Sequence, residues 1–239
     1  MKFTAVAFDL DGTLYPAFRL YVRLIPFFFR ENRLLMAMGK ARKQLRGSYN
    51  NSGPAAGAAE GDFYDAQARI MADVLHRRGS PKETWEEVRE HSERHIYRGW
   101  EQHFKKIRLF PHVKETLDAF RNAGIKLGLL SDFPPETKLE YLGISEYWSA
   151  VVCSERCGRL KPDPASFLEL ARRMGLPPEQ LLYVGNNVSY DVGGAAGVGM
   201  KTALIRSRWK SFVKAAFNKT PVPDFIFSDY RQLSQYVIG

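Results

Sequence analysis

Four short apolar runs along the chain each end abruptly in polar residues. The runs are Phe3–Phe8, Ile125–Leu130, Ala150–Cys153 and Leu181–Val184. Apolar runs of this length, partly β-branched and bounded by polar clusters, are typical of strands that are covered on both faces. The pattern therefore predicts four buried strands of a parallel sheet.

Helical patterns lie between these runs. The apolar residues of His112–Ala123 recur on one helical face, and Gly124 follows as a C-terminal stop. Asp163 and Pro164 are typical of an N-cap and a first helical position, and we expect Gly175 to end that helix. The alternation of strand and helix predicts an α/β fold with a doubly wound, Rossmann-like parallel sheet. The carboxyl ends of such strands meet at the edge where ligands bind, so we expect the polar clusters to converge there.

The stretch 17–106 breaks this rhythm and has a helical pattern. Asp62–Arg78 carries apolar residues at helical spacing, and Ser80–Glu83 has the residues of a capping box that opens a further helix. We interpret 17–106 as an inserted helical domain, and 1–16 together with 107–239 as the domain that holds the sheet.

Two carboxylates follow the first predicted strand. Asp9 and Asp11 are two residues apart, so an extended backbone would direct both side chains the same way. Gly12 permits a sharp turn directly afterwards, and Thr13 supplies a hydroxyl. Carboxylates this close repel each other, and Mg²⁺, which prefers oxygen ligands, is the simplest ion to neutralise them. A carboxylate can also attack phosphorus directly.

Four motifs follow the predicted strands in order: Asp9-Leu10-Asp11-Gly12-Thr13-Leu14, Ser131, Lys161-Pro162, and Gly185-Asn186 with Asp191. Together they resemble, in the same order, the motifs of the haloacid dehalogenase-like (HAD) hydrolase superfamily. The resemblance covers 1–15 and about 110–239, and the helical insertion lies where that family has its C1-type cap domain. The resemblance therefore implies an HAD-like core with a helical cap.

The resemblance also implies a role for each motif residue. Asp9 would be the nucleophile that forms an aspartyl-phosphate, and Asp11 would protonate the leaving oxygen and then deprotonate the hydrolytic water. Ser131 would hydrogen-bond a phosphoryl oxygen, and Lys161 would offset negative charge. The implied cofactor is Mg²⁺, held by the Asp9 carboxylate, the Asp11 backbone carbonyl and Asp191.

The chain departs from the family pattern at two positions. Asp132 follows Ser131 where the family usually has Asn, and Asn186 stands where it usually has Asp. Asn keeps an oxygen acceptor but removes a negative charge, so we expect Asn186 to be a direct or water-mediated neighbour of the metal. We also predict that Gly12, Thr13 and Asp132 contribute to substrate binding.

The predicted function is a Mg²⁺-dependent hydrolase that removes phosphate from a small organic phosphomonoester. Asp11 favours phosphate chemistry, because the true haloacid dehalogenases lack a carboxylate at that position and a departing halide needs no acid. A catalytically degenerate binding protein with the same fold is an alternative, as is a phosphomutase or a phosphonatase.

The distribution of charge along the chain points to two basic segments that could bind a ligand or a partner. The net charge is +9, and the residues from Tyr15 to Arg108 carry 18 basic and 11 acidic side chains. For the basic run 39–46 we favour a solvated helix face over contact with an anionic substrate. For the basic amphipathic pattern at 206–219 we favour packing on the protein's own core over a membrane surface or a partner. No nucleic-acid-binding motif accompanies the charge, so a nucleic-acid partner is not expected, and the oligomeric state is left open.

Composition excludes several further classes of protein and site. The two cysteines, Cys153 and Cys157, exclude a disulfide framework, and we interpret them as buried thiols of a cytoplasmic protein. No apolar stretch reaches the roughly 18–20 residues that a membrane-spanning helix needs. The five histidines show no His-x-x-His spacing, so we do not expect them to bind a metal.

Overall fold

The computed structural model describes residues 3–48, 60–77, 83–105, 107–206 and 221–239. These residues contain a six-stranded, all-parallel sheet with the strand order β3-β2-β1-β4-β5-β6. The strands are β1 (Ala5–Phe8), β2 (Lys126–Ser131), β3 (Ala150–Cys153), β4 (Leu181–Gly185), β5 (Lys201–Ile205) and β6 (Phe225–Phe227).

The four predicted strands are confirmed, with small shifts at their ends. β1 begins at Ala5, two residues later than expected. β2 begins and ends one residue later than expected. β5 and β6 were not predicted. β5 opens with an exposed lysine and a threonine, and β6 has only three residues, so neither forms an apolar run that is recognisable in isolation.

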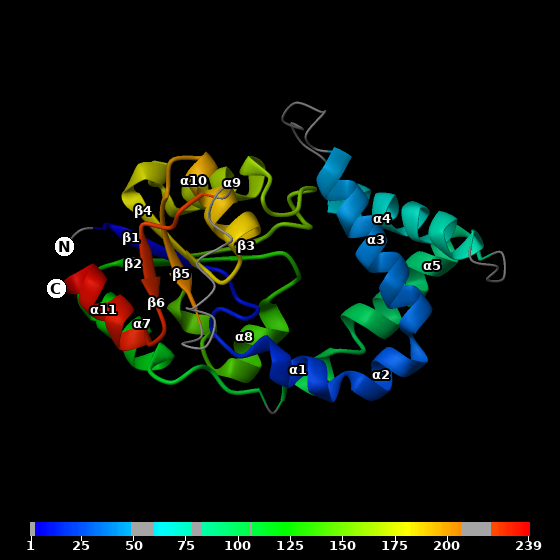
Figure 1. Ribbon diagram of the computed structural model, residues 1–239, viewed down its shortest axis with the longest axis horizontal. Coiled ribbons are helices and arrows are strands. Elements are labelled where there is room, and N and C mark those ends of the chain that lie inside the picture. The colour runs from blue at the N-terminus through cyan, green and yellow to red at the C-terminus, as the bar shows by residue number, and fades with distance from the viewer. Residues whose placement is uncertain (1–2, 49–59, 78–82, 106, 207–220) are drawn as a thin grey trace.

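Helices cover both faces of the sheet (Figure 1). α7 (Val113–Asn122) and α11 (Tyr230–Ile238) pack on one face, and α9 (Pro164–Met174) and α10 (Gly193–Gly197) on the other. Val6 and Phe8 of β1 join the core beneath α7 and α11, whereas Ala5 and Ala7 join the core beneath α9. Successive side chains of a strand point to opposite faces, which is why a doubly covered strand is apolar throughout.

The expected helix ends of the sheet layer are confirmed. The Asp163 side chain accepts a hydrogen bond from the backbone N–H of Ala165 at 2.9 Å, which caps α9. Gly175 follows α9 with a φ of +66°, and Gly124 follows α7 with a φ of +73°. Both positions require the left-handed conformation that glycine adopts without steric cost.

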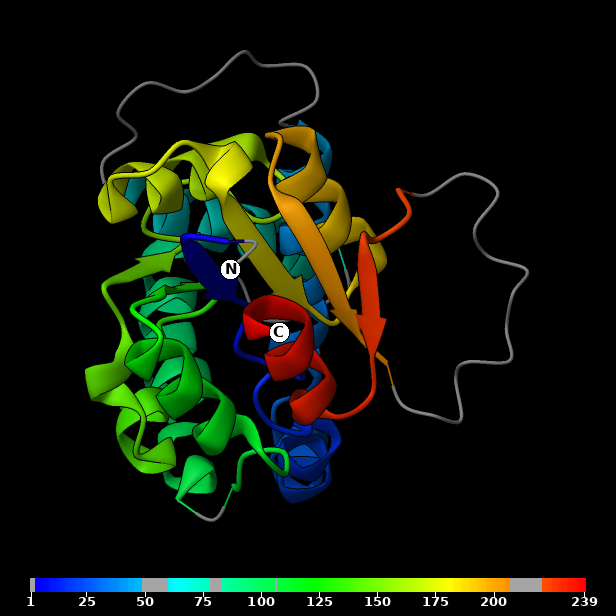
Figure 2. The same ribbon diagram turned by 90° about the vertical axis from the view of Figure 1, so that its left-hand side faces the viewer.

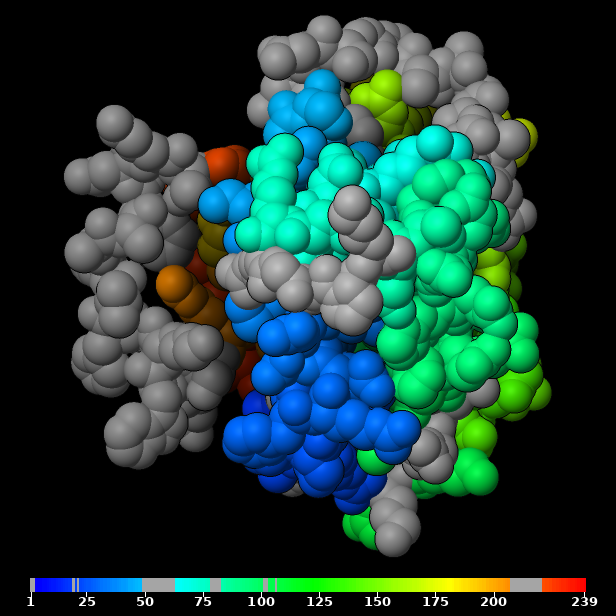
Figure 3. Space-filling model, turned by 90° about the vertical axis from the view of Figure 1, so that its right-hand side faces the viewer, coloured from blue at the N-terminus to red at the C-terminus, as the bar shows by residue number. Residues whose placement is uncertain are grey.

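A helical segment, which we define as α1–α6, lies at one end of the sheet (Figure 1). Its elements are α1 (Ala17–Arg23), α2 (Ile25–Arg30), α3 (Asn32–Ser48), α4 (Glu60–His76), α5 (Trp85–Ser92), the π-helix η2 (Glu93–Tyr97) and α6 (Glu101–Phe104). Met38, Met71, Val88 and Ile96 form an apolar core between its helices. Seen from that end, the molecule presents mainly this segment (Figure 3), and both chain ends lie at the opposite end (Figures 1 and 2). Among the described residues, no helix is both long and apolar enough to cross a membrane.

The predicted start of the helix after residue 80 is wrong. Ser80 lies outside the described residues, but Glu83 is not helical, and α5 begins at Trp85. The capping box is formed by Thr84 and Glu87 instead: Thr84 Oγ1 accepts from the Glu87 N–H at 3.3 Å, and Glu87 Oε2 accepts from the Thr84 N–H at 2.7 Å. Two adjacent segments, 80–83 and 84–87, fit the Ser/Thr-x-x-Glu pattern, and the structure forms the capping box at the second.

Candidate active site

The polar clusters meet at the carboxyl ends of the central strands. β1 lies between β2 and β4, and the order of the strands reverses at β1 and β4. Asp9 follows β1 directly, Ser131 ends β2, and Asn186 follows β4. Such a reversal opens a crevice at the sheet edge, because the connections from the two strands turn to opposite faces. The expected convergence of the motifs is therefore confirmed.

Lys161 lies between two buried carboxylates. Its Nζ donates to Asp9 Oδ1 at 2.7 Å and to Asp191 Oδ1 at 2.8 Å, and it lies 3.4 Å from the hydroxyl oxygen of Tyr183. All three charged side chains are at most 8% exposed. Lys161 comes from the loop between β3 and α9, whereas Asp191 lies in the π-helix Val188–Val192, so only the fold brings them together.

Burial dominates the electrostatics of this group. It raises the pKa of Asp9 to about 7 against the lowering effect of Lys161, and the charges of Asp191 and Asp11 add to the rise. The two carboxylates in turn hold the pKa of Lys161 well above its usual value despite burial. The carboxylates of Asp9, Asp11 and Asp191 therefore carry more negative charge than Lys161 alone balances.

The carboxylate and the backbone carbonyl of Asp11 bind different partners. Its carboxylate accepts from Lys138 Nζ at 2.7 Å on both oxygens and also from the hydroxyl of Tyr15. Its backbone carbonyl accepts from the side-chain amide of Asn186 at 3.1 Å. Gly12 follows with a φ of +89°, and a Cβ there would come within 2.0 Å of the Asn186 amide nitrogen. Only glycine fits this close approach.

Backbone N–H groups hold Asp191 in place. Its Oδ2 accepts from the N–H of Asn186 at 3.1 Å and of Asn187 at 2.9 Å. A Cβ at Gly185 would lie 2.3 Å from the Cβ of Asp191, so the glycine allows the carboxylate to lie against the end of β4. The Gly185-Asn186 sequence thus positions Asp191 through the backbone, whatever the side chain at 186.

Thr13, Ser131 and Asp132 occupy three different environments. The Thr13 hydroxyl donates to Asp9 Oδ2 at 2.7 Å and so orients that carboxylate. Ser131 is fully buried, and its hydroxyl oxygen accepts from the Phe133 N–H at 3.2 Å. Asp132 accepts from the Lys161 N–H at 3.1 Å, and Lys161 and two arginines hold the pKa of this partly buried carboxyl below its usual value.

The two arginines are Arg42 and Arg46 of α3, and they correct the interpretation of the basic run 39–46. Arg46 Nη2 donates to Asp132 at 2.7 Å, and its Nε donates to the Lys161 carbonyl at 2.9 Å. Arg42, 6% exposed, hydrogen-bonds to the fully buried Glu155. The run is therefore not simply a solvated face, because these two side chains reach carboxylates of the sheet domain.

Sequence reasoning missed Lys138, Arg42 and Glu155 as parts of this neighbourhood. Lys138 lies in α8 (Glu136–Leu142), which the sequence left unassigned, and Glu155 lies in the loop after β3. No local pattern distinguishes a buried Glu from a solvated one. For Arg42 the spacing to Arg46 was a signal, since residues four apart share a helix face.

The donor set fits a hard divalent cation. The carboxylates of Asp9, Asp11 and Asp191 exceed the charge of Lys138 and Lys161 by one, and the Asp11 carbonyl lies in the same group. Oxygen-only ligands of this kind are those that Mg²⁺ prefers. An anionic carboxylate beside a cation and lysines is also suited to phosphoryl transfer, where charge neutralisation lowers the barrier.

Residues 3–199 match the family model of haloacid dehalogenase-like hydrolases. The chain belongs to this family. This haloacid dehalogenase-like chain is 38% identical over 137 residues to a glyceraldehyde 3-phosphate phosphatase of Methanopyrus kandleri, in a match that covers 56% of this chain and 58% of that protein. It is also 38% identical over 94 residues to a phosphoglycolate phosphatase of Escherichia coli K12, covering 38% and 37%. The chain thus spans less than two thirds of the curated relatives it matches.

Solved structures show the same fold over the full length. An L-2-haloacid dehalogenase superposes with a TM-score of 0.69 at 22% identity, covering 100% of both chains. A HAD phosphatase from Thermococcus onnurineus superposes with a TM-score of 0.62 at 24% identity, covering 99% of this chain and 98% of that one. The family and its fold are therefore shown, as the resemblance implied.

Proposed function

We propose that this protein is a Mg²⁺-dependent phosphatase that removes phosphate from a small phosphorylated metabolite. The observation that carries the proposal is the buried arrangement of Asp9, Lys161 and Asp191 at the end of β1, with Asp11 beside it. The phosphatase names of the relatives in sequence support the same reaction class.

Asp9 and Asp11 would perform the two chemical steps. An oxygen of Asp9 attacks phosphorus, the bond from phosphorus to the leaving oxygen breaks, and Asp11 gives that oxygen a proton. Water then attacks the aspartyl-phosphate, Asp11 takes the proton of the water, and the carboxylate of Asp9 is released with inorganic phosphate. Thr13 supports the first step, because its hydrogen bond at 2.7 Å orients the Asp9 carboxylate.

Lys161 and Ser131 would act on the charge of the transferred group. Two carboxylates fix Lys161 in place. Its ammonium group would therefore stabilise negative charge on the transferred phosphoryl group without having to rearrange. Ser131 would donate its hydroxyl hydrogen to a phosphoryl oxygen while its oxygen continues to accept from the Phe133 N–H. Mg²⁺, held by Asp9, Asp191 and the Asp11 carbonyl with Asn186 as a neighbour, would neutralise the phosphoryl oxygens when bound.

The helical segment would serve as a cap domain that selects the leaving group. A cavity of about 860 Å³ lies between it and the sheet domain, lined among others by Tyr97, Trp100, Phe133, Lys138 and Arg156. Lys138 connects this cavity to the catalytic group, because it also binds both oxygens of Asp11. The lining combines aromatic side chains with four cationic and three acidic ones, and this mixture suits the polar organic part of a small phosphomonoester.

A phosphate-release assay on the full chain tests the proposal. Wild type, Asp9→Asn and the exposed control Asp73→Asn are compared on a panel of phosphomonoesters that includes p-nitrophenyl phosphate, with Mg²⁺ and with EDTA. We expect Mg²⁺-dependent release from wild type and from Asp73→Asn, and a loss of about 10³-fold or more for Asp9→Asn, which lacks the nucleophile.

The aspartyl-phosphate is tested separately from turnover. Acid-quenched enzyme is digested after brief exposure to substrate, and the peptide that contains Asp9 is examined by mass spectrometry for one added phosphoryl group. Equal phosphate release by Asp9→Asn and wild type, or a phosphorylated residue other than Asp9, contradicts the mechanism. No release from any member of the panel favours a binding protein of the same fold.

A further inference from the structure

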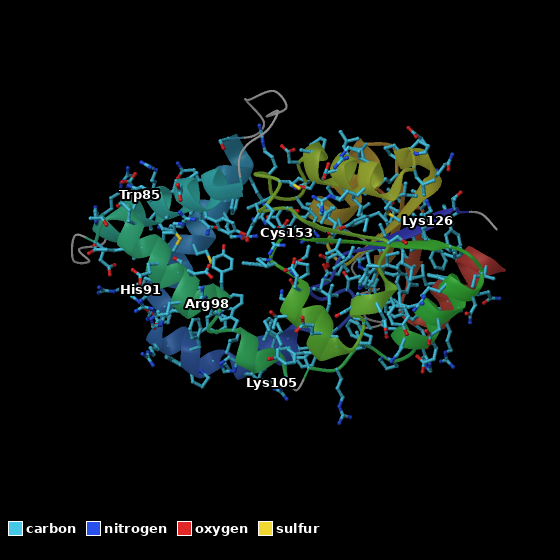
Figure 4. All side chains as sticks on the ribbon, turned by 180° about the vertical axis from the view of Figure 1, so that it is seen from behind. Trp85, His91, Arg98, Lys105, Lys126 and Cys153 are labelled. Atoms are coloured by element: carbon cyan, nitrogen blue, oxygen red, sulfur yellow. The ribbon has the colours of Figure 1, made fainter. Side chains whose placement is uncertain are left out.

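Three metal-ligating side chains converge within the helical segment, apart from the strand ends. Glu31 lies between α2 and α3, His91 lies on α5, and His95 lies on η2. One ligand atom of each lies within 4.8 Å of the others. Figure 4 shows His91 at the end of the molecule away from the sheet. The group therefore shares no residue with the proposed catalytic site, although η2 also carries Tyr97, which lines the cavity beside that site.

The distances among these atoms are compatible with the binding of one shared ion. His95 Nδ1 lies 3.2 Å from Glu31 Oε1, and His91 Nε2 lies 3.9 Å from Glu31 Oε2. Ligand atoms bound tetrahedrally to Zn²⁺ at about 2.0–2.1 Å lie about 3.4 Å from one another. All three atoms lie within 4.8 Å of one another, so they would need to approach each other to bind one Zn²⁺ ion.

The Glu31 side chain is mostly removed from water. It is 10% exposed, and its ion-pair neighbours in the part of the chain that the structure describes include the two imidazoles and Arg30, which lies 3.5 Å away with a 77% exposed side chain. A carboxylate removed from water needs close compensation of its charge. A divalent cation between Glu31 and the two rings would provide it.

We propose that Glu31, His91 and His95 bind Zn²⁺. Two imidazoles and one carboxylate are ligands typical of this ion, whereas Mg²⁺ prefers oxygen atoms alone. The rings are 37% and 26% exposed at the side chain, which leaves room for water as a fourth ligand. Glu83 Oε1 lies 3.6 Å from His91 Nδ1 and would orient the ring as an outer carboxylate.

The ion would join two parts of the helical segment. It would link the junction of α2 and α3 to α5 and η2, which are distant in the sequence. The expectation that no histidine binds a metal rested on His-x-x-His spacing, whereas His91 and His95 are four residues apart. That spacing also places both side chains on one face of a helix, so it was a usable signal.

Zinc binding by the full chain tests the proposal. Metal-free protein is titrated with Zn²⁺ against a chromophoric chelator, in excess Mg²⁺ that occupies the proposed catalytic site. We expect one tightly bound equivalent for wild type and for the control His103→Ala. His91→Ala and His95→Ala should each weaken binding about 100-fold or more, and the near-isosteric Glu31→Gln should weaken it while preserving the fold.

Co²⁺ substitution supplies a second readout. A four-coordinate Co²⁺ ion with nitrogen ligands absorbs visible light strongly, whereas a six-coordinate site of oxygen ligands does not. The strong bands should persist in Asp191→Asn and vanish in His91→Ala. The proposal is overturned if wild type binds no Zn²⁺ at micromolar concentration, or if the tight equivalent survives in both histidine variants.

Discussion

Arg42 of α3 and Glu155 of the loop after β3 form a buried ion pair that joins the helical segment to the sheet domain. Glu155 is fully buried, and it also accepts a hydrogen bond from Tyr97 of η2 at 3.1 Å. Burial raises the pKa of Glu155 although Arg42 opposes the rise. The pair therefore carries a high desolvation cost, and its two members depend on each other.

Breaking this pair should strongly destabilise the protein. Arg42→Met leaves Glu155 buried without its main cation, and we expect a loss of about 3–5 kcal/mol in the free energy of unfolding measured with urea. Arg94→Met is the matched control, because Arg94 pairs with Glu90 on the exposed face and should cost at most about 1 kcal/mol. The double variant Arg42→Met/Glu155→Gln should recover part of the loss, and equal costs for the two single arginine variants would refute the role of the pair.

The destabilisation by Arg42→Met should depend on pH. The folded-state pKa of Glu155 lies above its usual value, so its contribution to stability is fully present below the unfolded-state pKa of about 4.3 and is lost as pH rises from there through the folded-state pKa. Removal of the arginine raises the folded-state value further. The unfolded-state pKa is common to both proteins, so the gap between wild type and variant should be large at a pH above the folded-state pKa of Glu155 in wild type and should shrink at a pH below it. Urea unfolding at both pH values measures it, and a pH-independent gap would contradict this assignment.

Asn186 and Asp191 should differ in their effect on Mg²⁺. Asp191→Asn removes a buried carboxylate of the proposed metal site and should raise the Mg²⁺ concentration for half-maximal activity by at least about tenfold. Asn186→Asp restores a negative charge and should lower that concentration modestly, because repulsion from Asp9 and Asp11 also rises. An unchanged value in Asp191→Asn would mean that the fourth motif is wrongly assigned.

Lys138 should position Asp11 rather than take part in chemistry. Lys138→Met removes the cation that holds both oxygens of Asp11, and we expect kcat to fall about 10- to 100-fold, part of the usual contribution of an acid–base group. Lys138→Arg should restore part of kcat, which a merely structural role would not predict. The exposed Lys114→Met is the control, and a change in KM alone would show that Lys138 serves substrate binding instead.

Cys153 should be inert towards alkylating reagents in the native protein. Burial, with the charge of Glu155, raises its pKa to about 12, and burial also raises the pKa of Cys157. At pH 8 a thiol with a pKa of about 12 is ionised to about one part in 10⁴, and only the thiolate reacts. Cys153 should react with iodoacetamide promptly in urea and very slowly without it, as mass spectrometry of quenched samples can show.

Local patterns were sufficient for much of the fold. The runs that became β1–β4 are apolar throughout because helices cover both faces of the sheet, so each was visible without its neighbours. Asp163 and Gly175 likewise act within one turn of α9. The segment 206–219, whose pattern predicts an amphipathic helix, lies outside the described residues except for Arg206.

The motifs were likewise recognisable from the sequence alone, because Asp9, Asp11 and Lys161 each lie in a short, characteristic run of residues. Tertiary structure alone decided which charges face one another. Arg42 and Glu155 are 113 residues apart, and Lys138 and Asp11 are 127 apart. Burial and long-range pairing leave no local signature, because the same Arg, Lys or Glu is stable on a solvated surface. The partners of the catalytic residues therefore emerged only when the sheet and the helical segment were packed together.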